Sequence, residues 1–352
     1  MARIVRTAER LPRSVVAVAA AALVLWLAFT VPLAAGWRTL YFRDVFGNHL
    51  PAKAFGAQAL ARGEVPAFDP LLGNGQPYRA NPSHLAFYPD NLLYLALPFW
   101  SAFNLHFALH WLLAALAMAA LARALGMGPH ATLLAALTYG GSGFVLSGLT
   151  FYNVITVVAW WPLAIAGAVR GGARGVAAGG AACGMALLGG EPLLATLGLL
   201  PLLLAAAQRH GGRRGFATAV AVGLVGLAVA LPQIVATARA FDFTFRGSHG
   251  TWAGQVVLFT LSPLRYLELV LPLPFGWPME TGPRGWWLWR TAELGFYFLS
   301  LYAGIVALWL AAGALRRRPG WAALAVGGLL LAWLAGGAPE ALSALSGGTF
   351  RF

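Results

Sequence analysis

Four acidic side chains with the chemistry needed for catalysis lie in one polar segment of a very apolar chain, between Trp37 and Asn91. They are Asp44, Glu64, Asp69 and Asp90. Asp44 follows Arg43 directly, a few residues after an apolar run of membrane-spanning length. A carboxylate there is reached from both water and lipid, so it could hold a divalent cation such as Mg²⁺ or Mn²⁺, or act as general base on an acceptor hydroxyl. A surface Asp that pairs with Arg43, or that caps a helix beginning near Asn48, explains the same pattern without function.

A second set of candidates follows in the same segment, where Tyr78 to His84 reads YRANPSH. Tyr78 begins this stretch, which concentrates hydrogen-bonding side chains. Arg79 suits a phosphate, and Asn81 and His84 suit a sugar. An ordered polar loop without a ligand is the alternative interpretation.

Glu191 is a candidate for a second acid at the site. It lies between Gly190 and Pro192, where proline fits the first helical position and the preceding carboxylate can cap the helix. A carboxylate at the edge of a membrane span needs water or a partner, which favours function. Asn153 has the same two interpretations, a helix cap or a contact to substrate.

His106 and His110 share one helical face and could in principle bind zinc. No cysteine or carboxylate follows them at ligand spacing, so two polar groups that face the interior of a bundle are the better interpretation. Cys183 is the lone cysteine, which excludes disulfides within the chain and cysteine-based metal centres.

The composition indicates an integral membrane protein. Hydrophobic residues make up 59% of the chain and charged residues only 10%, and the mean hydropathy is +0.71. These values lie outside the usual range for soluble domains. The net charge of +13 does not indicate nucleic-acid binding, because the basic residues lie in short loops between apolar runs rather than in one patch.

Apolar runs predict an all-α, polytopic transmembrane bundle of about nine spans that forms one domain over residues 1–352. The predicted spans are Ser14–Ala35, Ala102–Ala122, His130–Thr150, Asn153–Val169, Gly175–Gly189, Pro192–Ala207, Phe216–Ala238, Leu294–Leu315 and Gly320–Ala338. The first is interpreted as an uncleaved signal anchor. Only Gly190 and Glu191 separate the fifth from the sixth, so one longer bent helix is the alternative. Glycines spaced four apart in the fifth predict close helix packing.

Arginines lie at the N-terminus and at every second span boundary after it, which predicts a cytoplasmic N-terminus in a multi-pass protein of the cytoplasmic membrane. Two long segments then face outward, residues 37–91 and 241–293. Within the first, Leu50 to Arg62 has apolar residues near helical spacing, with Lys53 among the polar ones, and predicts an amphipathic helix on the membrane surface. No predicted span carries a charge near its middle, which disfavours an ion-coupled transporter.

The chain resembles the YfhO-type bacterial membrane proteins of the GT-C glycosyltransferase superfamily. The resemblance spans nearly the whole chain and is most specific in the first outer segment. The motifs that carry it are Arg43-Asp44, Arg62-Gly63-Glu64-Val65-Pro66, Gly73-Asn74-Gly75-Gln76-Pro77-Tyr78 and Phe87-Tyr88-Pro89-Asp90-Asn91. Weaker echoes are Asn153 with Trp161-Pro162-Leu163, Gly190-Glu191-Pro192, and Leu271-Pro272-Leu273-Pro274-Phe275-Gly276. Members of this family usually continue into further spans and a soluble outer domain, so this chain looks like the front portion of such a protein.

The resemblance implies a GT-C-like fold whose first outer loop bears the catalytic or metal-binding acid, which maps onto Asp44, with Glu191 as a second catalytic candidate. The implied function is transfer of a sugar from a polyprenyl-phosphate donor, held by membrane lipid, to an envelope glycan or lipid acceptor. Arg43 is expected to bind substrate, and Arg79 or Arg246 is the cation expected to neutralise the donor phosphate. The alternative function is a non-enzymatic transporter or scaffold for a lipid-linked envelope precursor.

The arginine distribution makes the topology testable without a substrate. In Asn81→Cys, an impermeant thiol reagent is expected to label the new cysteine from outside the cell. In Gly172→Cys, labelling is expected only after the membrane is opened. The reverse pattern would contradict the predicted orientation and every site assigned to the outer face.

Overall fold

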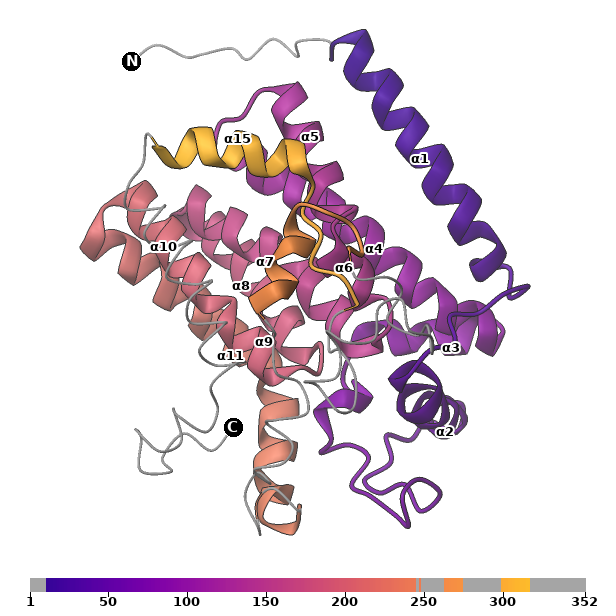
Figure 1. Cartoon of the computed structure of the whole chain (residues 1–352). Coiled ribbons are helices and arrows are strands. Elements are labelled where there is room, and N and C mark those ends of the chain that lie inside the picture. Colours follow the sequence, from indigo (N-terminus) through magenta and orange to yellow (C-terminus); the bar gives the residue numbers. More distant parts are fainter. Residues whose placement is uncertain (1–10, 245–246, 248–262, 275–298, 317–352) are drawn as a thin grey trace. The chain divides into compact units, whose positions relative to one another are not determined.

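The structure is a computed structural model that describes residues 11–244, 247, 263–274 and 299–316. Within these ranges every regular element is a helix, and one isolated β-bridge joins Asp69 to Gln76. The prediction of an all-helical protein is confirmed at this level (Figure 1).

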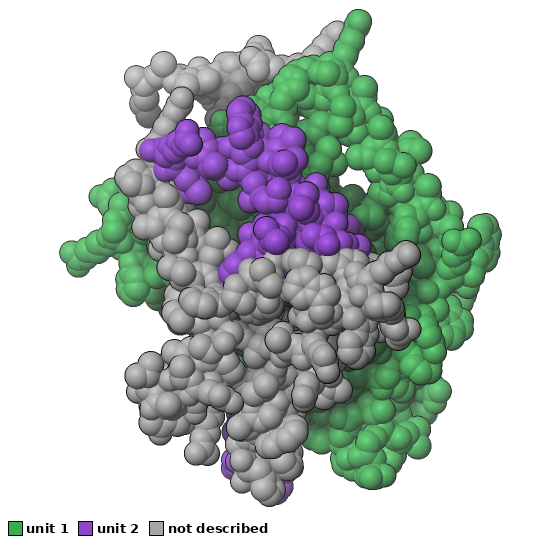
Figure 2. All heavy atoms as spheres, in the orientation of Figure 1, with its two compact units in different colours: residues 1–140, 149–236 green, residues 141–148, 237–352 purple. Residues whose placement is uncertain are grey.

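The chain divides by its contacts into two compact units, residues 1–140 with 149–236 and residues 141–148 with 237–352 (Figure 2). The helices that begin in the first unit are α1 Arg13–Ala34, α2 Leu50–Leu60, α3 Leu93–Ala96, α4 Phe99–Ala124, α5 Pro129–Gly140, α7 Tyr152–Arg170, α8 Gly172–Leu188, α9 Pro192–Leu197, α10 Leu199–His210 and α11 Gly212–Ala240. A π-helical turn, Val45–His49, precedes α2, and 3-10 helices cover Pro82–His84 and Pro89–Leu92.

The second unit has α6 Gly143–Gly148, α15 Ile305–Arg316 and the 3-10 helices Phe241–Phe243 and Pro263–Leu269. Arg265 and Glu268 form a buried bidentate ion pair in it, with N–O distances of 2.8 and 3.0 Å. The same carboxylate accepts a hydrogen bond from the backbone N–H of Leu301 at 3.1 Å. These contacts fasten the second 3-10 helix to the segment that leads into α15.

Six helices of the described chain are long and apolar enough to cross a membrane, which is compatible with a multi-pass membrane protein. They are Arg13–Ala34, Phe99–Ala124, Pro129–Gly148, Tyr152–Arg170, Pro192–His210 and Gly212–Phe243. The predicted span Gly175–Gly189 corresponds to α8, which has only 17 residues, and a separate α9 follows it, so this region is not one long bent helix. The span Leu294–Leu315 is described only in part, and Gly320–Ala338 lies outside the described residues. The total of nine spans stays a prediction.

Helix α7 is the centre of the first unit, and it is buried along most of its length between α4 and α8. Glycines let the backbones of α7 and α8 touch: a Cβ added at Gly167 would lie 2.4 Å from the Cα of Gly179 and 2.7 Å from the carbonyl oxygen of Gly175. The opposite face of α8 uses Gly180 and Gly184 to admit valines of α11. The predicted role of these glycines in close packing is therefore confirmed.

This packing gives a test with a matched control. Gly167→Ala is expected to lower the free energy of unfolding by about 1–3 kcal/mol, because the new methyl group must push the α8 backbone away. Gly223→Ala in α11, where no atom lies within 4 Å of the new Cβ, is expected to leave stability unchanged or to raise it slightly. Thermal unfolding of both variants in the same detergent makes the comparison, and equal stability would contradict the close approach of α7 and α8.

Candidate functional site

The first loop, residues 37–91, is fastened to the bundle where it leaves α1. Asn104 of α4 is fully buried and donates hydrogen bonds to the carbonyl oxygens of Leu33 and Arg38, at 3.0 and 2.9 Å. Its side-chain oxygen accepts a hydrogen bond from the hydroxyl of Thr39 at 2.8 Å. A single amide therefore binds the backbone both in the last turn of α1 and in the residues that follow this helix.

Asp44 lies on the surface of this loop, at the start of the π-helical turn. Within the described residues its carboxylate neither pairs with Arg43 nor caps the helix, so the two structural explanations considered for it are absent there. Arg43 has a left-handed backbone conformation, with φ of 48°, and its guanidinium lies 5.1 Å from the ring centre of Phe151. The result is an exposed carboxylate beside a cation that is held against the start of α7.

The other loop acids with local structural roles are Glu64 and Asp69. Glu64 forms an exposed ion pair with Arg62 at 3.5 Å. Asp69 is buried and accepts a hydrogen bond from the backbone N–H of Leu71 at 2.8 Å. Asp44 is thus the loop acid that faces solvent without such a bond in the described part of the chain.

An apolar groove of about 850 Å³ begins two residues after Asp44. It runs along α2 toward the first turn of α4, and it opens to the surface. Its lining residues are Phe46, Gly47, Leu50, Pro51, Ala54, Ala57, Gln58, Ala61, Phe99 and Trp100. Gln58 is the one side chain among them with a hydrogen-bonding group other than the Trp100 indole. The groove is large enough to hold part of a lipid chain.

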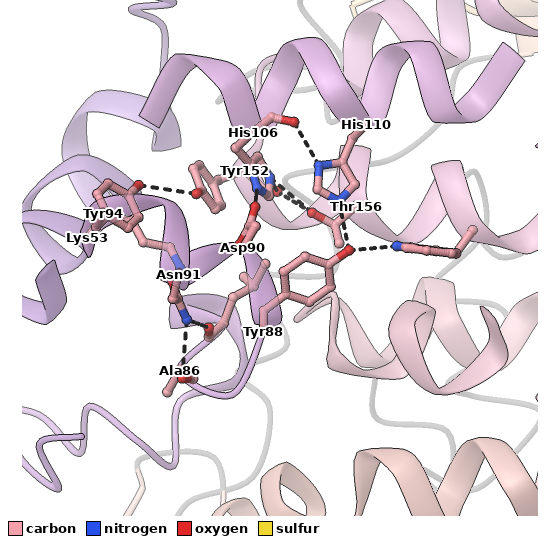
Figure 3. Close-up of polar contacts among 12 residues, drawn as sticks. Lys53, Ala86, Tyr88, Asp90, Asn91, Tyr94, His106, His110, Tyr152 and Thr156 are labelled. Atoms are coloured by element: carbon pink, nitrogen blue, oxygen red, sulfur yellow. Dashed lines mark hydrogen bonds and ion pairs between the residues drawn. The ribbon is translucent and has the colours of Figure 1, made fainter. Parts of the chain in front are cut away.

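A largely buried polar cluster lies where the first loop meets α4 and α7 (Figure 3). Its members are Tyr88, Asp90, His106, His110, Tyr152 and Thr156. Asp90 Oδ2 contacts Nδ1 of His106, and one proton must lie between these atoms. His106 Nε2 lies 2.8 Å from the carbonyl oxygen of Tyr152, which can only accept, so this nitrogen carries a hydrogen. Burial raises the pKa of Asp90, but the charges of His106 and Lys53 outweigh burial and the pKa is lowered overall.

The hydrogen bonds of His110 also have one possible direction. Its Nδ1 lies 2.7 Å from the carbonyl oxygen of His106 and must donate to it. Its Nε2 therefore accepts from the hydroxyl of Tyr88 at 2.7 Å, and Trp160 donates its indole N–H to that hydroxyl at 2.6 Å. This chain of bonds joins the loop to two helices.

Lys53 is 1% exposed, which corrects the prediction that it lies on the polar outer face of an amphipathic helix. The helix exists as α2, but Lys53 points inward and donates to Asn91 Oδ1 at 2.7 Å. Its ammonium also lies 4.8 Å from the ring centre of Tyr152. Burial lowers the pKa of Lys53 to about 8, although the charge of Asp90 opposes that shift. A helical pattern alone does not tell which face meets a loop partner and which meets water.

The residues predicted to bind a sugar hold the loop together in the structure. His84 is buried. Its ring centre lies 4.9 Å from that of Tyr78, and its Nδ1 lies 3.1 Å from the Tyr78 carbonyl oxygen. Burial lowers the pKa of His84 to about 4 and raises that of Tyr78 to about 12. Asn81 caps the 3-10 helix by accepting from the N–H of Ser83 at 3.1 Å. Their roles toward a substrate stay predictions.

Arg79 is exposed, and its carbonyl oxygen accepts a hydrogen bond from Gln233 of α11 at 3.2 Å. This bond links the loop to a third helix and leaves the guanidinium on the surface. Arg246, the other cation predicted to meet a phosphate, lies outside the described residues.

Glu191 and Asn153 contact each other at the start of α7. Asn153 donates to Glu191 Oε2 and to the carbonyl oxygen of Gly190, both at 3.2 Å. Glu191 is half-buried and its side chain makes no capping bond to α9. Arg43, the neighbour of Asp44, contacts Phe151, and Glu191 contacts Asn153. The segments that carry the two candidate acids therefore both contact the start of α7.

The carboxylate that completes the histidine pair could not be predicted from ligand spacing. No carboxylate follows His110 at such a spacing, and Asp90, which precedes His106, reaches it only through the fold. Asp90 was visible as an acid within the FYPDN motif, but nothing in its spacing indicated a partner on α4. Tyr152 and Thr156 carried no sequence signal, because they lie in an apolar run.

Comparison of the chain with protein-family models, with curated proteins and with solved structures finds no match. The resemblance to GT-C enzymes therefore stays a prediction from the motifs of the first loop.

The lowered pKa of Lys53 predicts how stability changes with pH. The charged form is unfavourable in the folded state, so the unfolded chain binds more protons between about pH 8 and pH 10.5. Stability is expected to rise through this window, by on the order of 3 kcal/mol in full. Unfolding at pH 7.5 and 9.5 is compared for the wild type and Lys53→Met, and the gain should be absent from the variant. A loss of wild-type stability on raising the pH to 9.5 would contradict a buried ammonium.

Proposed function

We propose that this protein is a glycosyltransferase of the cytoplasmic membrane that transfers a sugar from a polyprenyl-phosphate donor to an envelope polymer or lipid on the outer side. One observation carries the proposal: the exposed carboxylate of Asp44 lies two residues before an apolar groove open to the surface. A lipid-linked donor needs this combination, because its isoprenoid chain stays in an apolar environment while its sugar phosphate reaches a polar group.

The groove suits the lipid part of such a donor. Its lining is almost entirely apolar and combines small residues of α2 with the aromatic rings of Phe46, Phe99 and Trp100. Small side chains leave room for a chain to lie along the helix, and aromatic rings suit the level of the lipid headgroups. A donor bound here would extend from the lipid toward Asp44.

Asp44 would act as general base in an inverting displacement. The acceptor hydroxyl oxygen forms a bond to the anomeric carbon of the sugar, and the bond from that carbon to the phosphate oxygen breaks. The hydroxyl proton passes to the Asp44 carboxylate, and the polyprenyl phosphate leaves with the bonding electron pair. Arg43 or Arg79 would stabilise the charge that grows on the leaving phosphate. A divalent cation such as Mg²⁺ or Mn²⁺ held by Asp44 could supply the same stabilisation.

Glu191 would contribute a second carboxylate through its place beside Asn153. The half-buried Glu191 bonds to the buried Asn153, which lies two residues after Phe151, the residue that Arg43 contacts. A hydroxyl-rich acceptor could bind there by hydrogen bonds to both groups, which would orient it toward Asp44.

The test is a pair of variants measured with a radiolabelled or fluorescent lipid-linked sugar and purified protein. Asp44→Asn is expected to lower turnover by at least about 100-fold, because the amide cannot accept the proton, while donor binding persists. Glu64→Gln, which removes an exposed acid elsewhere in the same loop, is the matched control and should keep wild-type turnover.

Ala54→Trp tests the groove separately. The indole fills the space along α2, so donor binding is expected to weaken, whereas Leu71→Trp on an exposed part of the loop should have little effect. If the Asp44→Asn variant still binds the donor and cells that carry it keep wild-type glycan output, a transporter or scaffold for a lipid-linked precursor would be favoured instead. Unchanged donor binding in Ala54→Trp would contradict the groove as the lipid site.

A further inference from the structure

We propose that Asp90, His106 and His110 form a binding site for one divalent transition-metal ion of the Zn²⁺ class. The site is separate from the Mg²⁺ or Mn²⁺ ion considered at Asp44. It also does not depend on the proposed transferase activity, because the ion would hold the first loop onto α4 whatever reaction the loop serves.

The geometry of the three side chains suits one ion. Each residue offers a ligand atom, and these atoms all lie within 4.8 Å of one another. The two histidines are one turn apart on α4, with ring centres separated by 4.3 Å, and Asp90 comes from the 3-10 helix of the first loop. An ion bound here would connect two elements that are otherwise joined through hydrogen bonds.

In each imidazole, the nitrogen that would not bind the metal already donates its hydrogen to a carbonyl oxygen. His106 donates through Nε2 to the carbonyl oxygen of Tyr152, and His110 donates through Nδ1 to the carbonyl oxygen of His106. Ligating histidines usually give their second N–H to a carbonyl or carboxylate, which sets the tautomer and the ring orientation. The remaining nitrogen of each ring faces Asp90 or the Tyr88 hydroxyl.

One carboxylate oxygen of Asp90 could accept a further hydrogen bond or a metal ion. Asp90 Oδ1 is buried and forms no hydrogen bond within the described residues, while Oδ2 contacts His106. Leaving a buried carboxylate oxygen without a partner is unfavourable, and a bound cation would satisfy it. The ion would replace the proton that lies between Asp90 and His106, and it would displace the Tyr88 hydroxyl from His110.

The donor set selects the class of ion. Two imidazole nitrogens and one carboxylate oxygen suit Zn²⁺ and its first-row neighbours, whereas Mg²⁺ and Ca²⁺ favour sites built of oxygen. Lys53 is the nearby cation that competes for the charge of Asp90, but its hydrogen bond goes to Asn91 and leaves Oδ1 unbonded.

The experiment measures metal on the full chain purified without a histidine tag. Protein stripped with a chelator is dialysed against Zn²⁺ or Mg²⁺, and bound metal is counted by inductively coupled plasma mass spectrometry. One Zn²⁺ and no Mg²⁺ per chain are expected, with a higher melting temperature for the Zn²⁺ form. Asp90→Asn and His110→Gln should each lower Zn²⁺ affinity by at least about tenfold. His130→Ala and Glu64→Gln, which remove exposed side chains elsewhere, should retain it.

X-ray absorption of Zn²⁺-loaded wild type keeps the proposal testable if either ligand variant fails to fold. Scattering from two imidazoles is expected around the metal. Absence of stoichiometric Zn²⁺ in the wild type, equal binding in folded ligand variants, or a metal shell without imidazole would overturn the site. None of these readouts involves sugar transfer, so failure here is distinct from failure of the Asp44 test.

Discussion

The contact between the partly buried carboxylate of Asp90 and the fully buried ring of His106 is the interaction on which the arrangement of the first loop depends. A loop folded against membrane helices must find partners for its polar groups, because each buried group without one is costly. Asp90 Oδ2 pairs with His106 of α4, Lys53 donates a hydrogen bond to Asn91, and Asn104 binds the backbone where the loop leaves α1. These bonds fix the direction of α2. The groove follows from that direction, since one wall is α2 and the other begins at Phe99.

The helices could be predicted from the sequence because apolar runs are local and their length is set by the membrane. The exposed position of Asp44 could also be predicted, since it lies in the polar segment that follows the first span. The inward direction of Lys53 was not, because the pattern of α2 is compatible with lipid, water or a loop as neighbour. The pairing of Asp90 with His106 was hidden for a related reason: no period in the sequence links a 3-10 turn to a later helix. A sequence pattern indicates which residues share one face of a helix, whereas the site depends on which helix faces and loops contact each other.

The start of α7 contacts residues that are distant from it in the sequence. Phe151 receives the guanidinium of Arg43, and Asn153 bonds to Glu191 and to the backbone of Gly190. Gly190 has a positive φ of 84°, a conformation that favours glycine, and its carbonyl oxygen accepts the hydrogen bond from Asn153. The start of α7 therefore contacts both Arg43, which precedes it by more than 100 residues, and Glu191, which follows it in the chain. The three acids differ in environment: Asp44 is exposed, Glu191 is half-buried and bonds to Asn153, and Asp90 pairs with His106.

The glycine faces of α8 have a consequence for how the protein is made. This helix has 17 residues, carries glycines toward both α7 and α11, and gains its packing from backbone contact on two sides. Such a segment has little side-chain surface with which to hold itself in lipid while it is alone. Helix α7 is synthesised just before it, but α11 begins only after α9 and α10 have followed. Helix α8 therefore lacks its second packing partner until α11 has been synthesised.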